Sequence, residues 1–133
     1  MNPHYPDVAL RAKHRCEYCR APEAVFNFEF EVEHITPKAP GGTDSETNLA
    51  LACRACNLMK SDRVVATDPE MGQETRLFHP REDCWQEHFE IDSDRALIVG
   101  ITPIGRATVM QLKMNRELQV DARHHWLELG LFP

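Results

Sequence analysis

The sequence predicts an α+β fold in which short strands and helices surround a metal site. Residues 25–33 alternate apolar and polar side chains and are rich in phenylalanine and valine, a pattern typical of a half-buried strand. Residues 54–63 contain neither glycine nor proline and include many helix formers, which indicates a helix. Two C-x-x-C pairs lie on either side of the predicted strand, and paired cysteines at this spacing are typical of a metal site.

The other elements of the first half follow from apolar periodicity and turn residues. Residues 8–14 predict a short amphipathic helix ahead of the first cysteine pair. Two prolines and a Gly-Gly pair within residues 35–42 end the predicted strand. Residues 49–52 are a short apolar run that leads into the second cysteine pair. Residues 64–80 contain an Asp-Pro step and a glycine, and they predict a connecting loop.

The last third of the chain predicts a β-hairpin followed by two helices. Residues 88–91 and 96–99 are largely apolar and flank a polar turn, which is typical of a hairpin. Thr102 and the proline after it are typical of a helix start, with the threonine as N-cap. Asn115 is expected to cap a second helix that ends before Gly130.

Length and composition indicate one compact unit. The chain has 133 residues, of which 42% are hydrophobic and 27% charged, an ordinary globular composition. We expect a core over residues 1–66 and a hairpin-plus-helix extension over residues 67–133 that packs on it. The N-terminus lacks the basic start and apolar core of a signal peptide, and no apolar run approaches the ~20 residues of a transmembrane helix. We therefore expect a cytoplasmic protein with no membrane partner.

The net charge argues against a general polyanion binder. The formal charge is −6, whereas nucleic-acid-binding domains are usually basic over one face. The charge is unevenly distributed, however. Residues 34–63 carry four lysines or arginines against three carboxylates, so the acidic excess lies elsewhere in the chain.

Four of the five cysteines predict a structural zinc site. Each C-x-x-C pair directs two thiolates toward one ion, and two pairs complete the tetrahedral shell that zinc prefers. The predicted ligands are Cys16, Cys19, Cys53 and Cys56. A closed four-thiolate shell has no open position for a substrate, so this zinc is expected to stabilise the fold. The alternatives are four unrelated buried cysteines or a redox-active C-x-x-C pair.

Between the two cysteine pairs the order of residues resembles the HNH endonuclease family. The stretch contains Glu33-His34-Ile35-Thr36-Pro37, then Gly41-Gly42 and Asn48-Leu49, and it ends in Cys56-Asn57-Leu58-Met59-Lys60. The resemblance is closest over residues 16–63 and is to the zinc-bound, four-cysteine branch of the family. Residues 77–130 are more weakly similar to the tails of some bacterial members, and that similarity implies no mechanism. It implies a ββα-metal (His-Me finger) core, in which two short antiparallel strands and a helix hold one catalytic divalent ion.

The resemblance also implies a role for each residue of the motif. Glu33 and Asn57 would be ligands of the catalytic ion, and His34 would be the general base that activates water. Asn48 would brace the loop and orient His34. Because carboxylate and amide oxygens suit hard cations, Mg²⁺ or Mn²⁺ is the expected catalytic ion.

Elementary geometry constrains this site. Neighbouring residues on a strand point to opposite faces, so Glu33 and His34 serve one site only if the strand breaks there. The turn at residues 35–37 is expected to supply that break. Cys56 and Asn57 are adjacent on the predicted helix and about 100° apart around its axis. One side chain can therefore face the zinc while the other faces a second ion.

Three basic residues are candidates for contacts with phosphate groups. Lys60 lies one helical turn after Asn57 and on the same face, and Arg54 and Lys38 lie nearby in the sequence. Contacts of this kind make nucleic-acid binding salt-dependent.

Three hypotheses about function follow. The first is a metal-dependent endonuclease that hydrolyses phosphodiester bonds of DNA, with double-stranded DNA as the expected partner. The second is a catalytically inactive, zinc-stapled module that binds nucleic acid or protein. The third adds dimerisation or partner docking through residues 67–133 to either kind of core.

Overall fold

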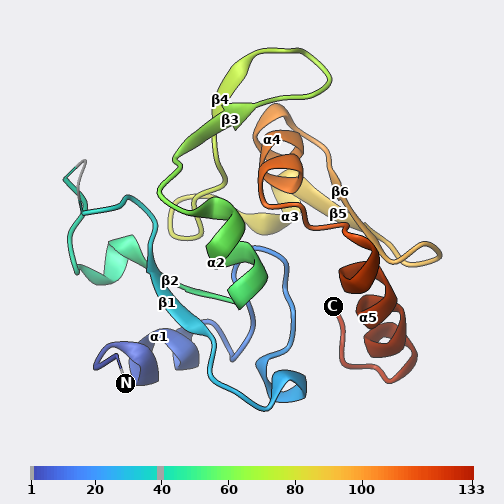
Figure 1. The fold of residues 1–133 in the computed structure, drawn as a ribbon, viewed down its shortest axis with the longest axis horizontal. Coiled ribbons are helices and arrows are strands. Elements are labelled where there is room, and N and C mark those ends of the chain that lie inside the picture. The colour runs from blue at the N-terminus through green and yellow to red at the C-terminus, as the bar shows by residue number, and fades with distance from the viewer. Residues whose placement is uncertain (1, 39–40) are drawn as a thin grey trace.

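The computed structural model describes residues 2–38 and 41–133. The elements of its first half, in chain order, are α1 (Tyr5–Arg11), the 3-10 helix η1 (Glu23–Phe26), β1 (Glu31–His34), η2 (Glu46–Asn48), β2 (Leu49–Ala52) and α2 (Arg54–Lys60). Those of the second half are β3 (Val65–Thr67), β4 (Glu74–Arg76), α3 (Trp85–His88), β5 (Phe89–Asp92), β6 (Leu97–Gly100), α4 (Pro103–Gln111) and α5 (Glu117–Glu128). Helices and short antiparallel strands are mixed along the chain, so the predicted α+β class is confirmed (Figure 1).

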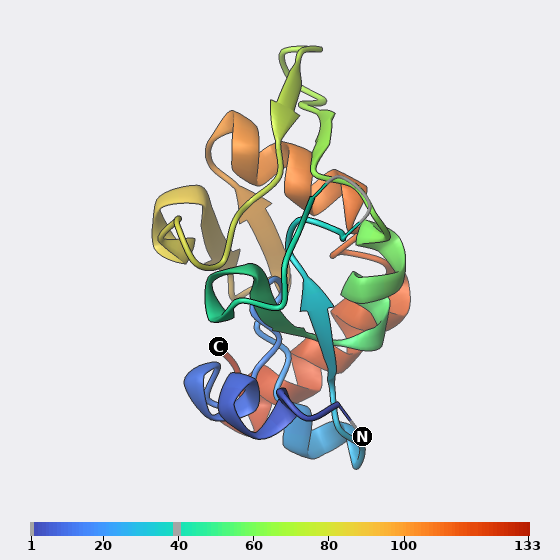
Figure 2. The same ribbon diagram turned by 90° about the vertical axis from the view of Figure 1, so that its left-hand side faces the viewer.

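The centre of the first half is a ββα unit made of β1, β2 and α2. The two strands pair antiparallel from Glu31 opposite Ala52 to His34 opposite Leu49. In Figure 2, α2 lies on one side of β1, and α1 and η2 lie on the other. This arrangement is consistent with the ββα-metal fold that the sequence resemblance implies.

The first strand is shorter than expected and starts later. The prediction of a strand over residues 25–33 is wrong up to residue 30, because the chain there forms η1 and then turns at Asn27, whose φ is 53°. The Glu23 carboxylate accepts a hydrogen bond from the Phe30 backbone N–H at 2.7 Å, so that donor is used locally and not in a sheet. The strand then continues through His34.

Residues 64–80 form a hairpin where a loop was predicted. β3 pairs with β4 from Val65 opposite Arg76 to Thr67 opposite Glu74. Asp68 is 1% exposed at the turn, and its carboxylate receives two hydrogen bonds from Arg106 at 2.8 and 2.9 Å. The hairpin is therefore fixed by an arginine from α4, which local sequence reasoning does not reveal.

The C-terminal elements largely match the prediction. β5 and β6 form the expected hairpin, and the Thr102 hydroxyl caps α4 by accepting from the Gly105 N–H at 3.0 Å. Asn115 is not the cap of α5, a role that falls to Arg116. Instead the Asn115 side chain bonds both backbone groups of Ile98, at 2.9 and 2.8 Å, and so ties the connection between α4 and α5 to β6.

One hydrophobic core includes residues from both halves of the chain. The Trp85 indole N–H donates to the carbonyl of Tyr18 at 2.8 Å, and Phe78 packs edge-on against Tyr18. On this basis we propose that residues 1–66 and 67–133 fold as one unit. Among the described residues, no helix combines the length and the apolar character needed to cross a membrane.

Candidate functional site

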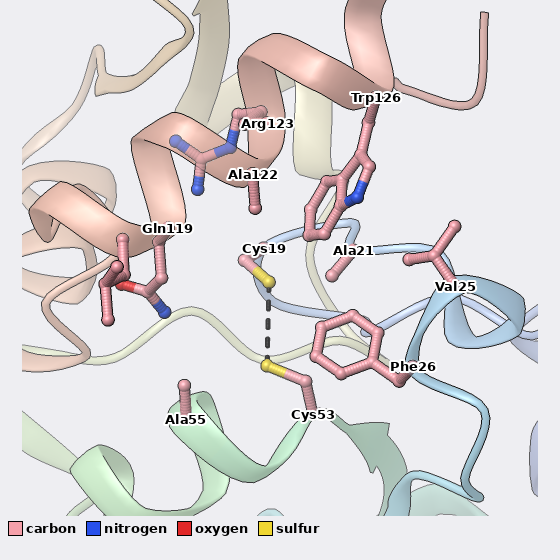
Figure 3. A pocket seen from close by; sticks show the side chains of 11 residues that line it. Cys19, Ala21, Val25, Phe26, Cys53, Ala55, Gln119, Ala122, Arg123 and Trp126 are labelled. Carbon is pink, nitrogen blue, oxygen red and sulfur yellow. Dashed lines mark hydrogen bonds between the residues drawn. The ribbon is translucent and has the colours of Figure 1, made fainter. Parts of the chain in front are cut away.

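Four buried thiols converge beside the start of α2. Their sulfur atoms all lie within 4.8 Å of one another, and the four residues are Cys16, Cys19, Cys53 and Cys56. Figure 3 shows the Cys19 and Cys53 sulfurs facing each other, 3.7 Å apart, beneath α5. Cys53 is also the N-cap of α2 and accepts a hydrogen bond from the Cys56 N–H at 3.4 Å. These buried thiols could hold a zinc ion in the closed geometry of a structural site.

Hydrogen bonds among these cysteines shift the pKa values of their thiols in opposite directions. Hydrogen bonds from Cys16 and Cys19 hold the pKa of Cys53 well below that of an ordinary thiol. Hydrogen bonding to Cys16 raises the pKa of both Cys19 and Cys56. Zinc binding requires deprotonated thiols, and the ion would replace the shared protons.

Glu33 is buried in the interior of the ββα unit. It is 4% exposed, accepts a hydrogen bond from the Tyr18 hydroxyl and has the Lys60 ammonium 3.1 Å from its Oε2 atom. Burial raises the pKa of Glu33, and the nearby Lys60 charge opposes that rise. Among the described residues, the Lys60 ammonium is the one polar partner of Oε2.

His34 is the last residue of β1, and its side chain is about one-third exposed. Its Nε2 atom lies 2.7 Å from Oδ1 of Asp44, whose other oxygen is 3.1 Å from the Lys38 ammonium. Hydrogen bonds from His34 and Lys38 lower the pKa of Asp44. An ionised carboxylate only accepts, so Nε2 carries the proton in this pair and Nδ1 is left as the basic nitrogen of a neutral ring.

Asn48 holds the loop that follows β1. Its Oδ1 accepts from the Thr36 N–H at 2.8 Å, and its Nδ2 donates to the carbonyls of Thr36 and Thr43 at 2.9 and 2.8 Å. The Ile35 N–H donates to the Asn48 carbonyl at 2.9 Å. Asn48 thus holds the loop after His34 at residues 35, 36 and 43. No hydrogen bond joins the Asn48 side chain to the His34 imidazole.

The predicted side chains on α2 engage β1 and the residues after it. Asn57 donates through Nδ2 to Glu31, and Arg54 lies 3.4 Å from the same carboxylate. Lys60 is 1% exposed and donates to the Ile35 carbonyl at 2.9 Å. A contact between Lys60 and phosphate would therefore require its ion pair to open.

The structure separates the two residues of the Glu-His pair. β1 continues one residue further than the expected break, so Glu33 faces Tyr18 and Lys60 while His34 faces Asp44. Sequence reasoning missed Tyr18 and Asp44, which approach the site from other segments. Glu31 had a signal, since it lies two positions before Glu33 and a strand places such residues on one face.

The predicted motif residues offer two oxygen atoms of the kind that hard divalent ions bind. Oε2 of Glu33 is a buried carboxylate oxygen that faces the Lys60 ammonium at 3.1 Å, so an ion there would take the place of that ammonium. Asn57 presents its amide nitrogen to Glu31, which leaves its oxygen free of any described hydrogen bond. Carboxylate and amide oxygens are ligands that Mg²⁺ and Mn²⁺ accept. In the structure, the Lys60 ammonium supplies positive charge beside Glu33.

A comparison with protein-family models matches residues 16–63 to the HNH endonuclease family. The matched segment runs from the first C-x-x-C pair to the residues just after α2, and its four cysteines match the zinc-bound branch of that family. The match indicates a nuclease-type or zinc-binding function related to nucleic acid. Comparisons with curated proteins and with solved structures gave no significant match.

Proposed function

We propose that this protein is a metal-dependent HNH endonuclease that hydrolyses phosphodiester bonds of double-stranded DNA. The observation that carries the proposal is the setting of His34. Its ring lies at the partly exposed end of β1, and the Asp44 carboxylate occupies Nε2. The remaining nitrogen, Nδ1, is available to take a proton from water.

In this mechanism His34 is the general base. Nδ1 accepts a proton as a water molecule attacks phosphorus, and the imidazolium that forms keeps its second proton on the Asp44 side. Asp44 stabilises that charge and keeps the ring in one orientation, as carboxylates paired with catalytic histidines do. Asn48 contributes by holding the loop after β1 in place.

Glu33 and Asn57 would hold the catalytic ion. A divalent cation at this position supplies positive charge for the leaving oxygen. Attacking and leaving oxygens lie on opposite sides of phosphorus in an in-line displacement. A base and a cation site on different sides of the β1 end are compatible with that geometry.

Positive side chains at the surface would contact the phosphates that flank the scissile bond. Lys38 and Arg54 are exposed, with about 61% and 76% of their side chains accessible. Lys60 is buried, and the contact that best fits its position is the ion pair that orients Glu33. The proposed order of importance for direct phosphate contacts therefore places Lys38 and Arg54 ahead of Lys60.

The proposal is tested by incubating the zinc-loaded protein with supercoiled plasmid, with and without Mg²⁺ or Mn²⁺. We expect conversion to nicked or linear plasmid only when the divalent ion is present. Binding of duplex DNA without cleavage under all metal conditions would support the inactive binding module instead. Cleavage that is equally fast without added ion would contradict the role given to the second metal.

A further inference from the structure

A second cavity of the molecule is lined by several basic residues. It has a volume of about 180 Å³ and lies between residues 11–20 and residues 78–85. Its basic lining residues, which we call the cationic pocket, are Arg11, Lys13, Arg15 and Arg20. Four cations within ten residues are unexpected in a chain whose net charge is −6.

The charge of the cationic pocket is not neutralised by the protein. None of its four cations lies within ion-pair distance of a carboxylate in residues 2–38 and 41–133. The pocket also contains Glu17 and Asp83, but Glu17 is paired with Arg81 and Asp83 with Arg76, the latter at 2.6 Å. The two carboxylates at this site are therefore paired with arginines other than the four pocket cations.

Neutral groups hold the arginines in position. Arg11 donates to the carbonyls of Glu46 and Leu49, and Arg15 donates to the carbonyls of Arg20 and Leu131. The Arg20 guanidinium stacks 5.0 Å above the Trp85 ring. Backbone carbonyls and an aromatic face orient a guanidinium without cancelling its charge.

Arginines at the pocket have lowered pKa values, and two pocket residues have an unusual backbone conformation. Burial lowers the pKa of Arg20, and the neighbouring Arg15 lowers it further. Burial and the charge of Arg11 lower the pKa of Arg81 to about 10, so its guanidinium stays protonated at neutral pH. Lys13 and Arg20 have φ values of 56° and 68°, a region that side-chain-bearing residues rarely adopt and that is enriched at functional sites.

The position of the pocket connects it to the proposed catalytic residues. Arg11 donates to the carbonyl of Leu49, which is the strand partner of His34. A second pocket residue, Glu17, donates its backbone N–H to the Leu51 carbonyl and accepts from the Leu51 N–H, both at 2.8 Å, so Arg11 and Glu17 both join the pocket to β2. The strand residue that pairs with His34 therefore also holds one cation of the pocket.

We propose that the cationic pocket binds the phosphodiester backbone of duplex DNA and so positions the substrate across His34. The inference takes its partner from the proposed function. It explains how an acidic protein can bind DNA, since four uncompensated cations at one place attract phosphate whatever the net charge. The contact is to phosphates, so it positions the duplex without reading its sequence.

The test compares two double variants that lose the same charge. Lys13→Gln/Arg20→Gln removes two pocket cations whose side chains make no hydrogen bond within the described residues, whereas Arg11 and Arg15 brace backbone carbonyls and are left unchanged. The matched control is Lys113→Gln/Arg116→Gln, which removes two exposed cations that also lack a carboxylate partner in the described chain. Zinc content and thermal unfolding establish that both variants are folded.

Binding is measured apart from cleavage, by fluorescence anisotropy of a labelled DNA duplex without added divalent ion and at several salt concentrations. We expect the pocket variant to bind about tenfold or more weakly at low salt. Its slope of log affinity against log salt should decrease by about 2, because about one unit is lost for each phosphate contact. The control variant should match the parent within about twofold.

The outcomes separate this inference from the proposed function. Equal affinity and equal salt dependence in the two double variants would overturn the inference, even if the parent cleaves DNA. Failure of the parent to bind the duplex at low salt would overturn it as well. The pocket variant could lose DNA binding selectively while the parent itself never cleaves DNA. That result would support the pocket as a binding site and contradict the nuclease proposal.

Discussion

Glu23 organises the N-terminal third of the chain through one carboxylate. Its oxygens accept hydrogen bonds from the Tyr5 hydroxyl at 2.8 Å and the Phe30 N–H at 2.7 Å, and Nδ1 of His14 lies 2.7 Å away. The residue is 7% exposed. A glutamate in η1 thus connects α1 to the residue just before β1.

These contacts predict a specific acid dependence. Burial alone would raise the pKa of Glu23, but hydrogen bonds from Phe30, His14 and Tyr5 outweigh it and hold the pKa below its usual value. A group whose pKa is lower in the folded state stabilises the fold above its unfolded pKa of about 4.3, and that stabilisation is lost as pH falls through the folded pKa. The parent should therefore lose stability below about pH 4.

Glu23→Gln removes this contribution. We expect the free energy of unfolding at pH 7 to fall by about 1–3 kcal/mol, because buried donors lose a charged acceptor. The part of the acid dependence that comes from Glu23 should also be missing from the variant. Urea unfolding at pH 7, 5 and 3.5 measures both effects, and parallel pH profiles for parent and variant would contradict the assignment.

Among the elements, sequence predicted those whose cause is local. The β5–β6 hairpin and the start of α4 at Thr102 were predicted because alternation, turn residues and an N-cap are visible in the sequence. The β3–β4 hairpin was missed because each strand has only three residues and Asp68 is held by Arg106, a contact 38 residues away in sequence. The early part of the predicted strand over 25–33 failed because Glu23 captures the Phe30 N–H.

The candidate site likewise divides into features with a local cause, which were predicted, and features that depend on distant contacts, which were not. The cysteine cluster was predicted in full, because ligand type and spacing are sufficient to identify a four-thiolate site. The predicted motif residues lie on β1, η2 and α2, with His34 and Asn48 at one end of the β1–β2 pair and Asn57 against Glu31 at the other. The pairing of His34 with Asp44 and of Glu33 with Tyr18 was not predicted, because these contacts depend on how separate segments pack.

At the scale of the whole molecule, the cysteine cluster connects the two halves of the chain. α5 lies over it, and Trp126 is directed toward Phe26, with 5.9 Å between the ring centroids (Figure 3). Arg123 is 2% exposed and donates to the carbonyls of Ala96 and Met114 at 2.7 and 2.8 Å. Loss of the cluster would therefore disturb α5 and the β5–β6 turn as well as residues 16–63.

Zinc removal should consequently unfold the whole chain and not the first half alone. Structural zinc contributes roughly 10–16 kcal/mol in small zinc peptides, which equals or exceeds the ~5–15 kcal/mol stability of an ordinary domain. Under reducing conditions, a strong chelator should abolish helical circular dichroism and the native tryptophan fluorescence in one transition. Readdition of Zn²⁺ should restore both signals. A chelated protein that keeps a cooperative thermal transition would contradict the proposal that the two halves fold as one unit.

The most direct measurement of the central claim is plasmid cleavage by the zinc-loaded parent, His34→Ala and His125→Ala in the presence of Mg²⁺ or Mn²⁺. His125 is an exposed histidine on α5 and controls for the loss of an imidazole. We expect His34→Ala to reduce the cleavage rate by a factor of about 10²–10⁴, the usual contribution of a general base, while His125→Ala cleaves like the parent. Equal cleavage by His34→Ala and the parent would place the chemistry elsewhere and contradict the proposed site.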